Sequence, residues 1–166
     1  MIVLWSGKFV MLSNLKMHVK IMTKRSLTLD VDPKAYAAVR GLEKYISESG
    51  LDKIHYKLIK IRASQLNGCA FCIDKHTKEA WELGLSEQRI YLLNAWRETA
   101  LYTEEERAIL ALTEEVTFIA GHGVSDEVYN KAVALFGEAY TKAIVMGIVT
   151  INAWNRIAIT DQWPLN

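Results

Sequence analysis

The chain has 166 residues, which suits a single domain, and carries 20 Lys and Arg against 19 Asp and Glu. The resulting formal net charge of +1 provides no basic surface of the kind that binds nucleic acid or an anionic membrane. No apolar run approaches the roughly 20 residues of a membrane-spanning helix. We therefore expect neither nucleic acid nor a membrane as a partner.

The first 21 residues form an unusual segment that is apolar and basic and contains no acidic residue. Lys8, Lys16 and Lys20 interrupt it, so it lacks the unbroken apolar stretch of a signal peptide. We interpret residues 1–21 as an upstream or vector-derived extension with Met22 as the natural start. Residues 22–166 are then expected to form one helical domain.

From Val31 onward, nearly every segment is predicted to be helical. Asp32 and Pro33 supply an N-cap followed by proline at the first helical position, and Gly50 ends this first helix. A second helix is expected over residues 52–66 and a third over residues 69–84, both with apolar side chains at three- and four-residue steps.

The later helices also begin at residues that can cap a helix. Ser86 and Ser125 are N-caps, Thr103 and Glu106 form a capping box, and residues 121–123 are predicted to be a loop. The expected helices are 87–99, 103–118, 125–137 and 141–160. The last of these is the most apolar and is expected to be buried on several sides.

The predicted fold class is all-α, a compact multi-helix bundle. No segment alternates apolar and polar residues for long enough to form a strand. The apolar fraction, 51%, is at the upper edge of the range for globular proteins. We therefore expect a homo-oligomer that buries its apolar helices between copies of the chain.

The only two cysteines, Cys69 and Cys72, lie three positions apart. A secreted domain held by disulfides would need more of them, so the pair favours a reducing, cytoplasmic location. Asn67 and Gly68 end one helix, and free backbone N–H groups at the start of the next favour a thiolate. Both sulfur atoms would share one helix face and could form a disulfide if the geometry allows.

His76 follows Cys72 by four residues and should lie on the same helix face. Its imidazole titrates near neutrality and can accept a thiol proton. A nucleophile, a second thiol and a base within one and a half turns are what thiolate attack, sulfenic acid formation and disulfide closure require.

Two other interpretations remain open. The cysteines could be small buried apolar residues. They could also bind a metal with His76, but these three residues fall short of the four ligands of a structural zinc site unless His55 or His122 supplies another. Redox chemistry is the preferred interpretation, with no metal and no cofactor.

Residues 63–76 resemble the signature of the alkylhydroperoxidase D-like (AhpD-like) proteins, which belong to the carboxymuconolactone decarboxylase superfamily. Residues 95–103 and 151–156 are similar to the short, single-domain members, and the resemblance extends over about residues 22–164. It implies an all-helical fold, homo-oligomers that are often trimers or hexamers, and thiol peroxidase or disulfide oxidoreductase activity.

The resemblance also implies roles for the three residues of the motif. Cys72 would attack the hydroperoxide substrate, Cys69 would resolve the sulfenic acid to a disulfide, and His76 would relay the proton. An external dithiol or disulfide reductase would supply the electrons. Helix position alone favours the opposite order, because Cys69 is nearer the helix start.

The chain departs from the family at the position twelve residues before the first cysteine, where many members carry a glutamate and this chain has Lys57. Lys57 could lower a nearby thiol pKa or point into solvent. His55 on the same helix and Ser64 in the motif are further supporting candidates. A second hypothesis, from a different class, is a non-enzymatic redox sensor or structural oligomer with the same disulfide.

Overall fold

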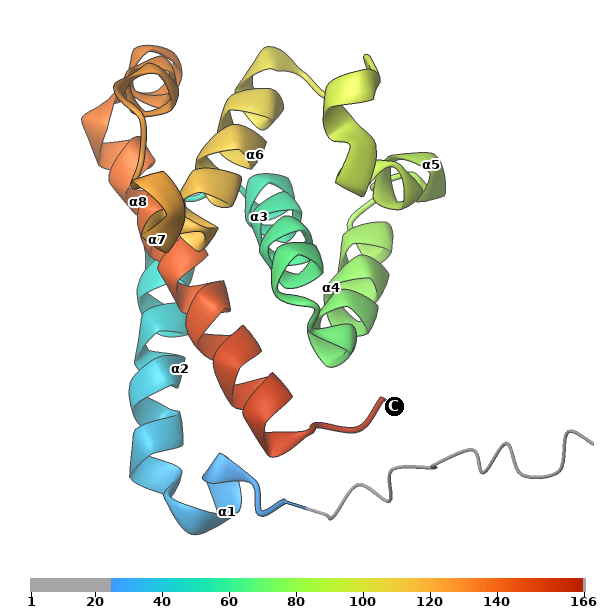
Figure 1. The fold of residues 1–166 in the computed structure, drawn as a ribbon, viewed down its shortest axis with the longest axis vertical. Helices are drawn as coiled ribbons and strands as arrows, with labels where there is room; N and C mark the ends of the chain where they lie inside the picture. Colours follow the sequence, from blue (N-terminus) through green and yellow to red (C-terminus); the bar gives the residue numbers. More distant parts are fainter. Residues whose placement is uncertain (1–24, 166) are drawn as a thin grey trace, which may run out of the picture.

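The fold is built only of helices, which confirms the all-α prediction. The structure, a computed structural model, describes residues 25–165, and no strand occurs in that range (Figure 1). The interpretation of residues 1–21 as an extension concerns residues outside it. The helices in chain order are α1 (Thr28–Val31), α2 (Pro33–Glu48), α3 (Lys53–Asn67), α4 (Ala70–Glu82), α5 (Glu87–Tyr91), η1 (Leu93–Glu98), α6 (Glu104–Thr117), α7 (Ile119–His122) and α8 (Asp126–Asp161).

Most helices begin at the cap residues that the sequence indicates. The Asp32 carboxylate accepts backbone hydrogen bonds at the start of α2, from Lys34 at 3.1 Å and from Ala35 at 3.0 Å. The capping box of α6 is complete, with Thr103 and Glu106 each bonded to the other's backbone N–H group. Local side-chain chemistry therefore sets these boundaries.

Two predicted boundaries are wrong. The expected helix 87–99 ends at Tyr91 and continues as the 3-10 helix η1, within which Ala95 has the non-helical angles φ −114° and ψ 26°. This tighter geometry buries both Leu93 and Trp96. The segment predicted as a loop at 121–123 instead begins within the short helix α7, and Gly123, which has a φ of 77°, follows it.

Helix α3 lies at the centre of the molecule, between α4, α6 and α8, while α2 runs beside α8 (Figure 1). The main core is an apolar cluster shared by α2, α3, α6 and α8. A second cluster joins α3, α4, α5 and η1. Because α3 contributes to both, it is fixed from several sides, and so is the turn that leads from it to the cysteines.

The last two predicted helices form one element, α8, that bends at Gly137. This glycine has φ 76° and ψ 165°, a conformation that side chains rarely adopt. By length and composition, α8 is the one helix among residues 25–165 that could cross a membrane. A core helix has the same properties, and the fully buried Ile144, Ile148 and Ile151 of α8 are core residues. The absence of a membrane partner remains a prediction.

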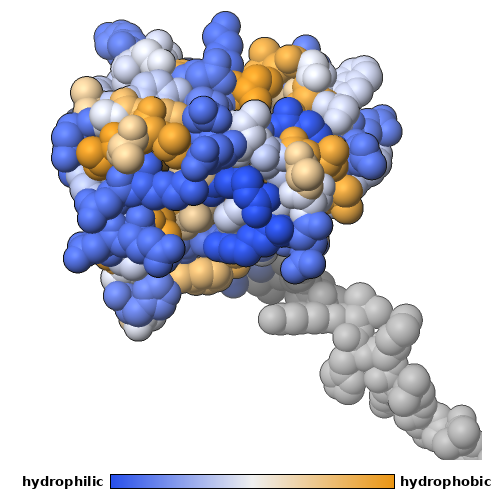
Figure 2. Space-filling model, turned by 90° about the horizontal axis from the view of Figure 1, so that it is seen from above, coloured by the Kyte–Doolittle hydropathy of each residue, from blue (hydrophilic) through white to orange (hydrophobic). Residues whose placement is uncertain are grey.

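Several large apolar side chains are exposed. Among the aromatic side chains, Tyr91 and Trp81 are the most exposed, with 69% and 61% of their surface accessible. Figure 2 shows, on one face of the molecule, apolar patches separated by hydrophilic side chains. Exposed aromatic residues of this kind are typical of surfaces that contact another protein.

Candidate active site

The two cysteines occupy the turn between α3 and α4. Gly68 ends α3 in the left-handed conformation, with φ 70° and ψ 30°, and Cys69 is the N-cap of α4. Cys69 and Cys72 form a disulfide with their Cα atoms 5.3 Å apart. The Cys69 Sγ also accepts a hydrogen bond from the backbone N–H of Cys72 at 3.3 Å. The predicted helix start and shared face are therefore both present.

The two sulfur-bearing residues differ in their surroundings. Both are buried, with 1% of Cys69 and 3% of Cys72 exposed. Cys72 lines a cavity of about 270 Å³ together with His76, whereas Cys69 is not part of its lining. A molecule that enters this cavity therefore meets Cys72 and not Cys69.

His76 is held by a carboxylate that the sequence analysis did not single out. Its Nδ1 lies 2.7 Å from Oε2 of Glu79, one turn further along α4. The same carboxylate oxygen accepts a hydrogen bond from Lys57 Nζ at 2.5 Å. Lys57 thus points into the site, and the carboxylate next to the histidine comes from α4, not from the α3 position that holds glutamate in many AhpD-like proteins.

Burial and neighbouring charges determine the protonation states of Glu79 and His76. Burial disfavours the charged form of Glu79, but the hydrogen bonds from His76 and Lys57 outweigh it and lower the pKa of Glu79 to about 2. Burial lowers the pKa of His76 below its usual value, although the hydrogen bond to Glu79 opposes this. At neutral pH an ionised Glu79 therefore accepts the Nδ1 proton of a neutral His76, which leaves Nε2 as an acceptor.

A second ion pair also lines the cavity. The Nζ atom of Lys60, which is only 6% exposed, lies 3.0 and 3.2 Å from the two carboxylate oxygens of Glu43. Tyr56 donates its hydroxyl proton to Glu43 at 3.1 Å, and Lys60 Nζ lies 4.1 Å from the Tyr56 ring centroid. Burial lowers the pKa of Lys60 and raises that of Tyr56.

Aromatic side chains also line the cavity. Tyr36 of α2 and Trp154 of α8 pack edge to face with ring centroids 5.0 Å apart. Phe71, between the two cysteines, packs in the same way on Trp163 at 4.9 Å. The cavity is therefore lined by both aromatic and charged side chains.

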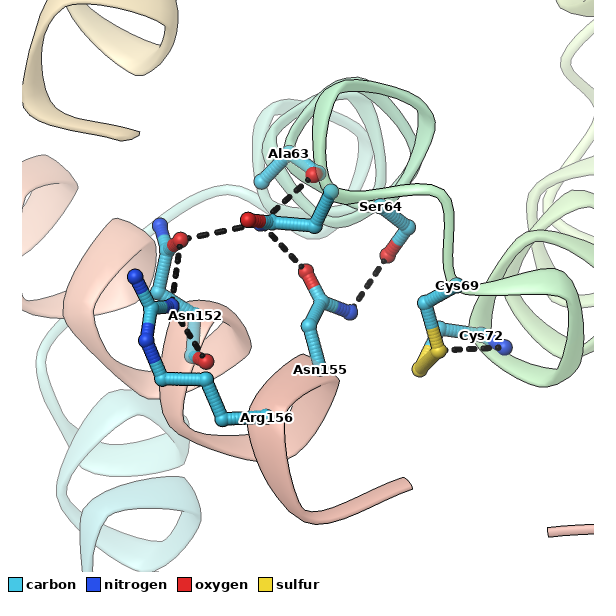
Figure 3. The surroundings of a disulfide bond; sticks show 8 residues. Ala63, Ser64, Cys69, Cys72, Asn152, Asn155 and Arg156 are labelled. Atoms are coloured by element: carbon cyan, nitrogen blue, oxygen red, sulfur yellow. Dashed lines mark hydrogen bonds between the residues drawn. A yellow bond between two sulfur atoms is a disulfide. The ribbon is translucent and has the colours of Figure 1, made fainter. Parts of the chain in front are cut away.

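A buried polar network fixes the cysteine turn (Figure 3). Asn155 of α8 is fully buried, and its amide donates to the Ser64 hydroxyl at 3.0 Å. Asn67 donates to the side-chain oxygens of Asn152 and Asn155 at 2.9 and 3.0 Å. The backbone carbonyl of Ser64 accepts the Cys69 N–H at 3.0 Å. Ser64 thus supports the turn without lining the cavity.

The remaining candidates lie elsewhere. His55 does not line the cysteine cavity; its Nδ1 lies 2.8 Å from the hydroxyl of Tyr140, and its ring packs edge to face on Phe136. His122 is exposed at the end of α7. Within residues 25–165, no group of three or more His, Cys, Asp or Glu side chains is placed to hold a metal ion.

Sequence reasoning missed several residues of the site. Glu79 could have been found, because it follows His76 by three residues on one helix and such side chains are neighbours. Glu43, Lys60 and Trp163 had no local signal. They reach the cavity only because α2, α3 and the segment after α8 meet there.

Comparisons with known proteins agree with this architecture. Residues 33–115 match the sequence model of the carboxymuconolactone decarboxylase family. An uncharacterized Bacillus subtilis protein, YdfG, is 42% identical over 138 residues, which span 83% of this chain and 94% of YdfG. The alkyl hydroperoxide reductase AhpD of Azorhizobium caulinodans is 42% identical over 45 residues, 27% of this chain and 25% of that protein.

Two kinds of solved structure share the fold. A protein of unknown function from Agrobacterium tumefaciens, for which an antioxidant defence role as AhpD has been suggested, superposes with a TM-score of 0.84 at 42% identity and covers 87% of this chain and 99% of its own. The debrominase Bmp8 has a TM-score of 0.74 at 19% identity over 84% of this chain and 75% of its own, a likeness of fold alone. With its helical fold, its Cys69–Cys72 motif and these matches, the chain belongs to the carboxymuconolactone decarboxylase family as an AhpD-like protein.

Proposed function

We propose that the protein is a thiol-dependent peroxidase that reduces organic hydroperoxides with the Cys69–Cys72 pair. One observation carries the proposal: Cys72 shares its cavity with His76, and His76 is hydrogen-bonded through Nδ1 to an ionised Glu79. A cysteine that shares its cavity with a neutral imidazole supports the proposal, because a neighbouring base can activate a thiol.

In the first step, reduced Cys72 gives its thiol proton to Nε2 of His76, and the thiolate attacks the distal oxygen of the hydroperoxide. The S–O bond forms while the O–O bond breaks, so Cys72 becomes a sulfenic acid. The alkoxide leaves as an alcohol after it takes a proton from the imidazolium. Sulfur is oxidised by two electrons and the peroxide is reduced by two.

Glu79 is a positioning residue in this scheme. Its carboxylate fixes the tautomer of His76 and stabilises the imidazolium that forms transiently, as a carboxylate does beside a catalytic histidine. Lys57 holds Glu79 in turn at 2.5 Å. A carboxylate from α4 thereby takes the place of the family's glutamate on α3.

In the second step, the Cys69 thiol loses its proton and the thiolate attacks the sulfur of the Cys72 sulfenic acid. The S–S bond forms while the S–O bond breaks, and the expelled hydroxide takes up the proton lost by Cys69 and leaves as water. The backbone N–H of Cys72 that points at Cys69 Sγ stabilises negative charge on this sulfur. The product is the disulfide of the present structure. An external dithiol then transfers two electrons and two protons to regenerate the thiols.

The proposal is tested by mixing the reduced protein with cumene hydroperoxide and measuring both peroxide consumption and loss of free thiols. The wild type is expected to consume one peroxide for each pair of thiols lost. Cys72→Ser should leave the peroxide unconsumed. If Cys72→Ser consumed peroxide at the wild-type rate, the proposal would be wrong.

A further inference from the structure

The charges around the cysteine cavity are unbalanced. Four cationic side chains, Arg40, Lys57, Lys60 and Lys75, line it against only two carboxylates. The carboxylates Glu43 and Glu79 neutralise Lys60 and Lys57 through the ion pairs described above. Arg40 and Lys75 therefore provide the excess positive charge.

Arg40 and Lys75 approach the cavity from different helices, Arg40 from α2 and Lys75 from α4. Both residues are exposed, and neither forms an ion pair with another residue in the range 25–165. Two cations without carboxylate partners beside one cavity attract an anion and raise its local concentration. The Arg40 guanidinium also suits a planar carboxylate, which it can bind through two parallel hydrogen bonds.

The aromatic residues of the lining determine what kind of anion fits. Tyr36, Phe71, Trp154 and Trp163 present aromatic surface next to Cys72. A small inorganic anion would leave this surface exposed to water, whereas an organic group would cover it. The cavity of about 270 Å³ can take one aromatic ring or a short alkyl chain.

We infer that the substrate is an organic hydroperoxide that carries a carboxylate, with its apolar body against the aromatic residues and its carboxylate at Arg40 and Lys75. This inference rests on the proposed peroxidase function and specifies its substrate class. The O–O bond is cleaved by Cys72 as described above, and the carboxylate takes no part in the redox step.

The test compares cumene hydroperoxide that bears a para-carboxylate with its methyl ester, which has the same body but no charge and one additional methyl group. For the wild-type enzyme, kcat/KM for the acid is expected to exceed that for the ester by about ten-fold at low salt, and added salt should reduce this ratio. In Arg40→Gln/Lys75→Gln the ratio should fall close to one.

Lys131→Gln is the matched control, because Lys131 is an exposed cation of α8 that pairs with Glu104 and does not line the cavity. It should keep the wild-type ratio. Equal kcat/KM for acid and ester in the wild type, or an unchanged ratio in the double variant, would overturn the inference and leave the peroxidase function intact. Failure to consume either substrate would instead refute the peroxidase function, and the inference with it.

Discussion

The Nδ1 atom of His76 and the Oε2 atom of Glu79 lie 2.7 Å apart, and the carboxylate that completes this pair stands one helical turn from the histidine it orients. Lys57 of α3 donates a hydrogen bond to the same carboxylate oxygen. The position that appeared to lack a proton-relay glutamate therefore carries the cation that holds Glu79 in place.

Glu79→Gln is expected to slow peroxide-driven disulfide formation by about ten-fold at neutral pH, because an amide fixes the imidazole tautomer less well and does not stabilise the imidazolium. The rate is measured by stopped flow on the reduced protein between pH 4 and 8. The exposed Glu82 of the same helix supplies the control, Glu82→Gln, which should retain the wild-type rate.

The pH profile separates this role from a merely structural one. His76 must be neutral to act as a base. Because burial lowers the pKa of His76, protonation of His76 should slow the reaction only below about pH 6.5. The Glu79 carboxylate raises the pKa of His76, and its removal must lower that pKa further. In Glu79→Gln, the drop of the rate on the acid side of the pH profile should move to lower pH, and the maximum rate at neutral pH should decrease. A drop at the same pH as in the wild type would contradict the proposed contact between the two side chains.

Lys57→Glu restores the glutamate of many family members but places a second carboxylate beside Glu79. Like charges at this distance cannot both ionise readily, so the pKa of Glu79 should rise from about 2 and peroxidase turnover should fall about five-fold. Lys57→Met removes the positive charge without adding repulsion. Its turnover rate in a steady-state assay should lie between that of Lys57→Glu and that of the wild type. A gain of turnover in Lys57→Glu would show that α3, and not α4, is the proper source of the carboxylate.

Asn155→Ala tests the network that supports the cysteine turn. The substitution removes the amide that donates to the buried Ser64 hydroxyl and one of the acceptors of Asn67, and should lower the free energy of unfolding by about 2 kcal/mol. Denaturant unfolding of the oxidised protein measures the loss. Asn130 is an exposed asparagine of the same helix, so Asn130→Ala should change stability by no more than about 0.5 kcal/mol.

A trimer or hexamer remains a prediction, supported by the exposed aromatic side chains of Trp81 and Tyr91. Native mass spectrometry of the reduced and the oxidised protein should give the same subunit number in both states. A subunit number that changes with the disulfide would favour the redox-sensor hypothesis instead. Trp81→Glu is expected to lower the subunit number if this residue is at the interface.

The sequence was most informative where structure depends on neighbouring residues. The caps at Asp32 and Ser125 and the Cys69 helix start follow from local hydrogen bonding, and each is present. The break after Tyr91 could not be predicted, because burial of Leu93 and Trp96 against other helices selects it. The helix at 119–122 is a single turn with no side-chain cap and no buried residue, so no sequence pattern indicates it.

The same distinction holds in the site. Cys69, Cys72 and His76 lie on one turn-and-helix segment and could be identified from spacing. The partner of Lys57 depends on how α3 packs against α4, and sequence alone left open whether this lysine faced solvent. Tertiary packing decides which charges meet, so the cationic character of the cavity emerged only from the fold.

The order of the two cysteines is the central claim, and trapping the sulfenic acid tests it most directly. Each single variant, Cys69→Ser and Cys72→Ser, is reduced, mixed with one equivalent of hydroperoxide in the presence of dimedone, and analysed by peptide mass spectrometry. The account predicts a dimedone adduct on Cys72 in Cys69→Ser and none on Cys69 in Cys72→Ser. An adduct on Cys69 in Cys72→Ser, with none in Cys69→Ser, would contradict it.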